Sequence, residues 1–384
     1  MSKHDFAKLK NIEKGKDGSE SSKVLHICKV YLPVKGGVQR VVQRITARLA
    51  DFTHQVITTG EDGAVDRQQL DRADVIRCRS YGQLASMPIA PSLPGQVIKI
   101  ARKQDLIALH YPFPLAELAL CFFFSNTPIV VHWHSNIIAQ KKLKWLVAPL
   151  TLVVLWRAKA IVATSGRMIE NSFWLKRFRN KVRTIPYGME SVTPSQTLPL
   201  APNGYFVVIG RHVSYKGIDV AIRSLEHSDH RLIIVGDGPL FERHKLLAED
   251  LGLKARVKFE QQANDEKVNE ILQSAIALVV SSNRENEAFA LVQLEAMRLG
   301  KAVINTNLNS SVPWVARHEK EALTVPPDDA KALAQAMQTL KADPELASSL
   351  GEQGLLRYQE KFTAEHFAQA TSELYRAHAK SLAQ

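Results

Sequence analysis

Short apolar runs alternate with segments of helical spacing along the whole chain, and the runs fall into two series. The first series occupies 24–30, 54–58, 106–110, 129–134, 160–164 and 182–185, and the second occupies 205–209, 231–235, 257–260, 276–280 and 301–304. Such runs are typical of buried strands in a parallel sheet covered by helices. The chain is therefore predicted to be an α/β protein with two Rossmann-like halves.

A Pro/Ser/Thr-rich stretch separates the two series, and 384 residues exceed what one core usually organises. We expect a first domain over 23–188, a linker over 189–203 and a second domain over 204–361. Residues 1–22 are polar and Gly/Ser-rich, so they are expected to form a disordered, non-catalytic tail without a signal peptide. Beyond residue 330 the pattern is helical to the end, with Asp343-Pro344 as a helix start signal.

The most informative stretch is 281–305, which reads SSNRENEAFALVQLEAMRLGKAVIN. It predicts a strand, a short helix over 291–299 closed by Gly300, and another strand. Glu287 precedes this helix and Glu295 lies inside it, about 12 Å further along the axis. Two carboxylates at that spacing cannot share a proton, but they can hold opposite ends of an elongated ligand. Backbone N–H groups at the helix start would face an anion between them.

Polar residues and glycines recur at or just after the carboxyl ends of the predicted strands, where open α/β sheets bind ligands. These candidates are Gly36, Gly37, His110, His132, His134, Gly210, Arg211, Lys216, Gly217 and the turn Gly236-Asp237-Gly238-Pro239. Each has a structural alternative. The two glycine stretches also fit tight turns, Arg211 and Lys216 also fit a solvated pair, and the histidines also fit a core with satisfied hydrogen bonds.

These residues could bind a phosphorylated ligand whose diphosphate leaves during a reaction. Arg211 and Lys216 could neutralise a departing diphosphate, and His134 or His110 could bind a sugar hydroxyl. Gly236 could offer its backbone to a nucleotide base. The histidine and carboxylate spacings match no familiar metal site, so no tightly bound metal and no other cofactor is expected.

Positive charge is concentrated in the first half of the chain. Residues 1–200 hold 29 Lys+Arg against 14 Asp+Glu, and 141–183 hold eleven basic residues and one acidic residue beside the apolar run 145–156. That run is too short to span a bilayer. It is consistent either with a core helix that has a solvated basic rim or with an interfacial surface on anionic lipid. No nucleic-acid-binding motif accompanies it.

The three cysteines, Cys28, Cys78 and Cys121, are far apart and match no metal spacing, which is typical of reduced thiols in a cytosolic protein. The expected location is therefore cytoplasmic, with peripheral contact at the inner face of the cytoplasmic membrane if the basic segment binds lipid.

Taken together, these residues resemble the retaining glycosyltransferases of family 4, over most of 24–375. The segment from Glu287 to Glu295 is similar to the family's E-x7-E motif, although alanines flank Phe289 where glycines are usual. The resemblance implies the GT-B architecture, in which two Rossmann-like domains face each other across a cleft and the last helix, here 362–384, returns to the first domain.

The resemblance also implies roles for individual residues. Arg211 and Lys216 would bind the donor diphosphate, Glu287 the transferred sugar and Glu295 the ribose. The amides of Phe289, Ala290 and Leu291 would meet the distal phosphate. Gly36 and Gly37 would lie on the first-domain side, and His134 would match the active-site histidine, followed by Asn136 where related sequences often have aspartate.

The expected function is transfer of a hexose, with GDP-mannose as the first choice of donor and UDP-sugars next, to a hydroxyl of a lipid-linked cell-envelope glycan. No carboxylate nucleophile is evident, so front-face attack assisted by the leaving phosphate is expected. Two alternatives remain: a nucleotide-sugar epimerase or phosphorylase of the same architecture, and a non-catalytic, membrane-associated scaffold.

Overall fold

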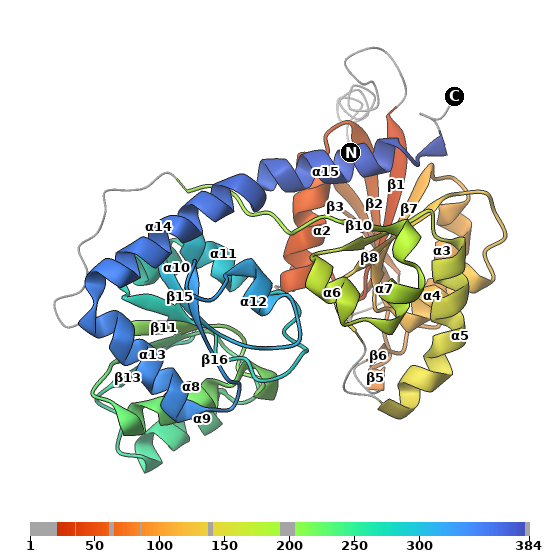
Figure 1. The fold of residues 1–384 in the computed structure, drawn as a ribbon. Coiled ribbons are helices and arrows are strands. Elements are labelled where there is room, and N and C mark those ends of the chain that lie inside the picture. Colours follow the sequence, from red (N-terminus) through yellow and green to blue (C-terminus); the bar gives the residue numbers. More distant parts are fainter. Residues whose placement is uncertain are drawn as a thin grey trace, which may run out of the picture. The chain divides into compact units, whose positions relative to one another are not determined.

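The computed structural model describes residues 21–34, 36–60, 65–84, 87–136, 141–192 and 204–380. The chain forms two compact units (Figure 1). The first unit comprises Met1–Ile185 and Phe367–Gln384, and the second unit comprises Pro186–His366. Most of the predicted tail and most of the predicted linker lie outside the described residues.

The first unit is built around a sheet whose described strands follow the order β10-β9-β8-β7-β1-β2-β4-β3. Their bounds are β1 Ser22–Ile27, β2 Phe52–Gly60, β3 Asp66–Leu70, β4 Ala73–Arg79, β7 Leu106–Tyr111, β8 Ile129–Trp133, β9 Ala160–Ala163 and β10 Val182–Thr184. All neighbours pair in parallel except β3, which runs antiparallel to β4. A separate hairpin pairs β5 Gln83–Leu84 with β6 Met87–Pro88.

Helices of the first unit connect these strands. They are α2 Gly37–Arg48, α3 Leu93–Ala101, α4 Pro114–Cys121, α5 Lys141–Arg157, α6 Gly166–Glu170 and α7 Phe173–Arg177. The last helix, α15 Ala364–Arg376, contributes its carboxyl-terminal part, and Tyr375 on it is fully buried. No helix among the described residues is long and apolar enough to cross a membrane.

The second unit has a fully parallel sheet in the order β13-β12-β11-β14-β15-β16. The strands are β11 Phe206–Ile209, β12 Leu232–Val235, β13 Val257–Glu260, β14 Ala277–Val279, β15 Ala302–Thr306 and β16 Ala322–Val325. Its helices are α8 Ile218–Ser224, α9 Phe241–Asp250, α10 Asp265–Ser274, α11 Val292–Met297, α12 Val312–Val315, α13 Ala330–Ala342 and α14 Pro344–Lys361.

Every predicted apolar run overlaps a strand, and two helix-boundary signals are confirmed. Gly300 ends the α11 region with φ +65°, and Asp343 accepts a hydrogen bond from the Leu346 N–H to start α14. Ser22, expected in the tail, is buried and begins β1. The last helix, expected from 362, begins at Ala364, because Phe362 caps the carboxyl end of α14.

Candidate functional site

The centre of the candidate site in the second unit is an ion pair between Lys216 and Glu287. Lys216 Nζ lies 2.5 Å from Glu287 Oε2, and both side chains are more than four-fifths buried. Ser282, just beyond β14, donates a hydrogen bond from its hydroxyl to the same oxygen at 3.0 Å. Lys216, expected at the donor diphosphate, and Glu287, expected at the transferred sugar, therefore contact each other directly.

Electrostatics keep Lys216 protonated at this position. Burial by itself lowers the pKa of Lys216, but the negative charge of Glu287, with smaller contributions from Tyr215 and Glu295, outweighs burial and raises the pKa overall. Glu295 on α11 is thus close enough to influence the ammonium, and it is buried like Glu287. The site combines one fixed cation with two carboxylates from the ends of a single short segment.

The loop from Glu287 to Leu291 has an unusual backbone that the surrounding core holds in place. Ala290 has φ +57°, in the left-handed region that favours glycine. Gln293, fully buried on α11, donates from its amide to the carbonyl of Phe289 at 3.2 Å, and Asn305 on β15 donates to Gln293 Oε1 at 2.9 Å. These two amides fix the position of the predicted phosphate-binding loop, and sequence reasoning missed both.

Glycines bring the strand ends of this unit close together. A Cβ on Gly217, which has φ +60°, would lie 2.1 Å from the carbonyl oxygen of Ser281. A Cβ on Gly236, with φ +134°, would lie 2.2 Å from the carbonyl oxygen of Gly210. Both glycines are therefore required for packing. Arg211, by contrast, is exposed at the end of β11.

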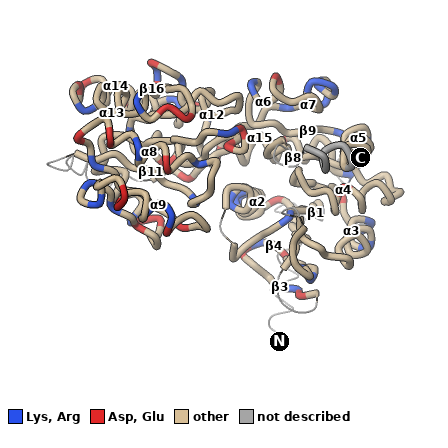
Figure 2. The backbone as a smooth tube through the Cα atoms, turned by 90° about the horizontal axis from the view of Figure 1, so that it is seen from below, with Lys and Arg blue, Asp and Glu red and all other residues tan. Residues whose placement is uncertain are grey.

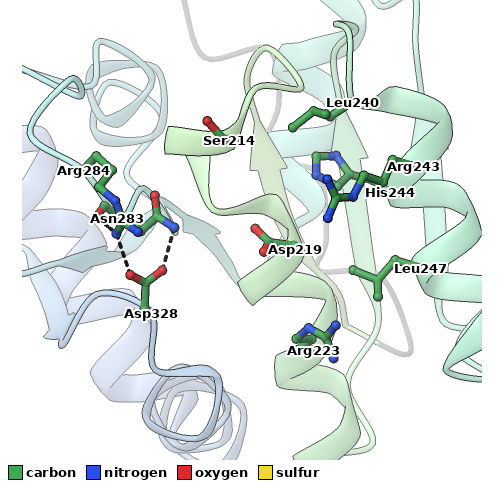
Figure 3. Close-up of a pocket in the computed structure, with 10 residues that line it drawn as sticks. All are labelled: Ser214, Asp219, Arg223, Leu240, Arg243, His244, Leu247, Asn283, Arg284 and Asp328. Carbon is green, nitrogen blue, oxygen red and sulfur yellow. Dashed lines mark hydrogen bonds and ion pairs between the residues drawn. The ribbon is translucent and has the colours of Figure 1, made fainter. Parts of the chain in front are cut away.

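A pocket of about 440 Å³ in the second unit does not contain the predicted donor residues. It lies between α8 and α9 on one side and the segment of Asn283 and Arg284 on the other (Figure 3). Asn283 and Arg284 both point toward Asp328 and donate hydrogen bonds to its carboxylate, each at 2.6 Å. Lys216 instead borders a much smaller pocket with Gly210 and Ser281.

In the first unit, Gly36 and Gly37 lie at the start of α2. Gly36 is the residue before the helix, with an extended backbone (φ −179°), and a Cβ there would meet only the flexible side chain of Gln39. The backbone geometry alone does not require glycine at 36, so its absent side chain leaves room rather than relieving strain.

The predicted histidines of the first unit are buried. His134 follows β8, and its backbone N–H donates to the carbonyl of Tyr111 at 3.1 Å. His110 contacts His134 and His26 through its two ring nitrogens, so neither nitrogen is left for a ligand. His132 contacts the hydroxyl of Tyr375 at 2.7 Å. His26 and His54, which belong to the same cluster, were not selected from the sequence.

The side chain of Asn136 makes two hydrogen bonds that explain why asparagine stands where related sequences often have aspartate. Its side-chain oxygen accepts a hydrogen bond from the Trp133 indole at 3.2 Å, and its amide nitrogen donates to the Asn171 carbonyl at 3.4 Å. An aspartate could accept from Trp133 but could not donate to Asn171. Within the described ranges, no cluster of three or more His, Cys, Asp or Glu residues could hold a metal ion.

Comparison with known sequences identifies both halves of the chain. Residues 196–357 match the family described as "Glycosyl transferases group 1", and residues 36–188 match "Glycosyl transferase 4-like domain". The D-rhamnosyltransferase WbpZ of Pseudomonas aeruginosa is 31% identical over 89% of this chain and 92% of its own length. The O-antigen chain mannosyltransferase C of Escherichia coli is 28% identical over 92% of this chain and 98% of its own.

Solved structures show the same fold. The sucrose-phosphate synthase of Thermosynechococcus elongatus has a TM-score of 0.74 at 22% identity and covers 93% of this chain and 98% of its own. The lipopolysaccharide glycosyltransferase WaaG has a TM-score of 0.68 at 16% identity, covering 91% and 99%. With two Rossmann-like units of the GT-B type and matching sequences over both, the chain belongs to the glycosyltransferases of family 4.

Proposed function

We propose that the protein transfers a hexose, with retention of configuration, from a nucleotide diphosphate sugar to a hydroxyl of a lipid-linked cell-envelope glycan. The observation that carries this proposal is the buried Lys216–Glu287 pair at the strand ends of the second unit. A fixed ammonium there can bind the diphosphate that leaves when the sugar is transferred. Glu287 beside it can accept hydrogen bonds from the hydroxyls of the transferred sugar.

The neighbouring residues complete the donor site in this proposal. Arg211 binds the diphosphate with Lys216, and the amides of Phe289, Ala290 and Leu291 face the distal phosphate. Glu295 binds the ribose hydroxyls, and the backbone at Gly236 contacts the base. In the first unit, Gly36 and Gly37 leave room for substrate at the start of α2, and His134 binds a substrate hydroxyl.

The reaction in this proposal is a front-face substitution at the anomeric carbon. The acceptor oxygen attacks on the face from which the diphosphate leaves, and a phosphate oxygen takes the hydroxyl proton, so configuration is retained. The charge that develops on the leaving group is stabilised by Lys216 and Arg211, a contribution often worth several kcal/mol. No tightly bound metal is needed, so transfer should persist in excess EDTA.

Mannose from GDP-mannose is the first choice of donor sugar. It is supported by the names of the two relatives that match nearly the whole chain, an O-antigen chain mannosyltransferase and a D-rhamnosyltransferase. Thermal-shift titration with GDP-mannose, GDP-rhamnose, UDP-glucose and UDP-GlcNAc tests this choice. A donor present at 100 times its Kd should stabilise the protein by about 2.7 kcal/mol, and a shift with UDP-sugars alone would replace GDP-mannose.

The function of the ion pair is tested by Lys216→Ala and Glu287→Gln. Each variant should lower kcat/KM at least about tenfold, because it removes either the cation at the leaving group or the carboxylate at the sugar. Lys341→Ala, which removes a surface ion pair with Asp229 in the same unit, is the matched control and should remain active. Full transfer activity in both site variants, with the fold intact, would contradict the proposed role of Lys216 and Glu287 in transfer.

We further propose that one edge of the first unit contacts anionic membrane. Three exposed aromatic side chains, Phe122, Phe124 and Trp156, lie at the ends of α4 and α5. Arg157 on α5 joins these ends by donating to the carbonyls of Leu120 and Phe123. Lys181 donates to the carbonyl of Trp156 at 2.5 Å, which places a second cation beside the aromatic residues.

Aromatic residues beside cations are typical of surfaces that bind anionic lipid. Figure 2 shows further Lys and Arg residues along α2, α3 and α7. Co-sedimentation with phosphatidylglycerol vesicles should be strong at low salt, weaker at high salt, and reduced in Phe124→Ser/Trp156→Ser. Leu246→Ser, an exposed position on α9 of the second unit, is the control. Equal binding to neutral vesicles would contradict the proposed contact with anionic membrane and favour a solvated basic rim.

A further inference from the structure

Four buried histidines form a row across neighbouring strands of the first unit. His54 lies on β2, His26 on β1, His110 on β7, and His134 directly after β8. The register makes the row diagonal: His54 pairs with Val24, His26 with Ala108, and His110 with His132. Each histidine therefore lies two residues nearer the carboxyl end of the sheet than the one before it. Side chains two residues apart share a face, so the rings meet on one face of the sheet.

The rings of the row are joined by hydrogen bonds. His54 Nε2 lies 2.9 Å from the carbonyl oxygen of Leu49. His54 Nδ1 lies 3.1 Å from His26 Nε2, and His26 Nδ1 lies 3.2 Å from His110 Nε2. His110 Nδ1 lies 2.9 Å from His134 Nε2. The row thus runs without a break from a backbone carbonyl to His134.

The carbonyl at one end determines the direction of every bond in the row. A carbonyl oxygen only accepts, so His54 must carry its hydrogen on Nε2 and leave Nδ1 as an acceptor. His26 then donates from Nε2 to His54, and His110 donates from Nε2 to His26. By the same rule, His134 donates from Nε2 to His110. Any hydrogen bond at His134 Nδ1 must therefore be donated to that nitrogen.

These hydrogen-bond directions hold for neutral rings, since a protonated histidine donates from both nitrogens. Burial lowers the pKa of His54 to about 4 and that of His134 to about 3, and it lowers the pKa values of His26 and His110 well below the usual range. Among the described residues, the polar groups that face the row include His132, whose ring stacks on His110 at 4.9 Å, and the hydroxyl of Tyr375 from α15. Arg72 adds a positive charge near His54 that further disfavours protonation.

We propose that His54, His26 and His110 are positioning residues that hold His134 in its Nε2–H tautomer, so that Nδ1 accepts a hydrogen bond from a substrate hydroxyl. This inference rests on the proposed role of His134 in substrate binding. The backbone carbonyl of Leu49, at the other end of the row, would then determine which nitrogen of His134 carries the hydrogen.

The tautomer can be read directly by NMR, without an activity assay. In protein labelled with 15N-histidine, long-range 1H–15N correlation near pH 7.5 distinguishes a protonated ring nitrogen from a bare one. The His134→Gln spectrum assigns the His134 signals by their loss. We expect His134 with hydrogen on Nε2 and none on Nδ1. A His134 that carries its hydrogen on Nδ1 overturns the proposal, and this measurement needs no substitution of His54, His26 or His110.

His54→Phe then removes the first ring of the row while keeping an aromatic side chain in its place. His26 Nε2–H would be left as a buried donor without an acceptor, which reversal of the row avoids. We expect an Nδ1–H population of His134 to appear and kcat to fall in proportion to the Nε2–H form lost. His132→Phe is the matched control, because His132 is equally buried and touches the row only by stacking.

The outcomes separate the row from the proposed function. An unchanged His134 tautomer in a folded His54→Phe variant overturns the positioning role, whatever its activity. If the His134 tautomer changes but kcat does not, the positioning role of the row is supported. The proposed binding of a substrate hydroxyl by His134 is then contradicted. A changed tautomer with a proportional loss of kcat, absent from His132→Phe, supports both.

Discussion

Ala290 occupies a backbone conformation that is costly for any residue with a side chain. At φ +57° its Cβ crowds its own backbone, which costs roughly 1–2 kcal/mol. The surrounding hydrogen bonds of Gln293 and Asn305 hold the loop in this shape in spite of the cost. The alanine also keeps the loop less free to move than glycine would, beside the residues proposed to bind the donor.

Ala290→Gly should therefore stabilise the second unit. The strain relieved exceeds the extra freedom of glycine in the unfolded chain, so we expect a gain of up to about 1 kcal/mol in the free energy of unfolding. Ala288→Gly, at a neighbouring position without a positive φ, should instead destabilise the protein. Urea unfolding of the unchanged protein and the two variants measures both effects. A loss of stability in Ala290→Gly would contradict the claim that the backbone at Ala290 is strained.

At the scale of elements, apolar runs predicted most of the central strands because those strands are buried on both faces. Strands without such a run were missed: β4, ADVIRCR, is interrupted by charged residues, β16 is short and lies at the edge of its sheet, and β3, DRQQL, is largely exposed at the edge of the sheet against β4. A polar edge strand has no apolar run to reveal it. The antiparallel pairing of β3 with β4 likewise depends on which strand lies next to it in space.

The histidine row shows why the site could be predicted only in part. Lys216 and Glu287 follow adjacent strands, β11 and β14, and residues at adjacent strand ends could be expected to meet. His26 and His54 lie inside strands, and their contact with His110 depends on the register between β2, β1 and β7. Sequence spacing carries no information about that register, so a histidine in a strand could not be told from an ordinary core residue.

Burial of neutral histidines should make the first unit sensitive to acid. Folding lowers their pKa values, to about 4 for His54 and about 3 for His132, whereas the unfolded chain binds protons near pH 6.5. The unfolded state then holds more protons below pH 6.5, so stability is fully present above that pH and is lost as the pH falls toward 4.

Urea unfolding between pH 6 and pH 5, read by hydrogen exchange of β1 and β7 amides, should show this loss. His132→Phe should reduce the pH slope by up to one proton, which corresponds to about 1.4 kcal/mol per pH unit. A slope unchanged by that substitution would mean that His132 is protonated in the folded protein as readily as in the unfolded chain.

At the scale of the whole molecule, the first unit is assembled from both ends of the described chain. Phe367–Gln384 belongs to it, although the intervening Pro186–His366 forms the second unit. Tyr375 packs edge-on against Phe52 on β2, with ring centres 5.9 Å apart, and contacts His132 on β8. Lys380 donates to the Thr127 hydroxyl at 2.9 Å. The unit's core and its histidine row therefore depend on the final segment.

A chain ending at His366 should destabilise the first unit and leave the second unit folded. It removes the buried side chains of Phe367, Leu374 and Tyr375, each worth about 1.5–3 kcal/mol. Limited proteolysis should then cut within the first unit, while the second unit, which ends at His366, stays protected. A chain ending at Lys380 keeps every described contact and should resist cleavage in both units. If both truncated chains resisted cleavage equally, the final segment would not be part of the first unit's cooperative fold.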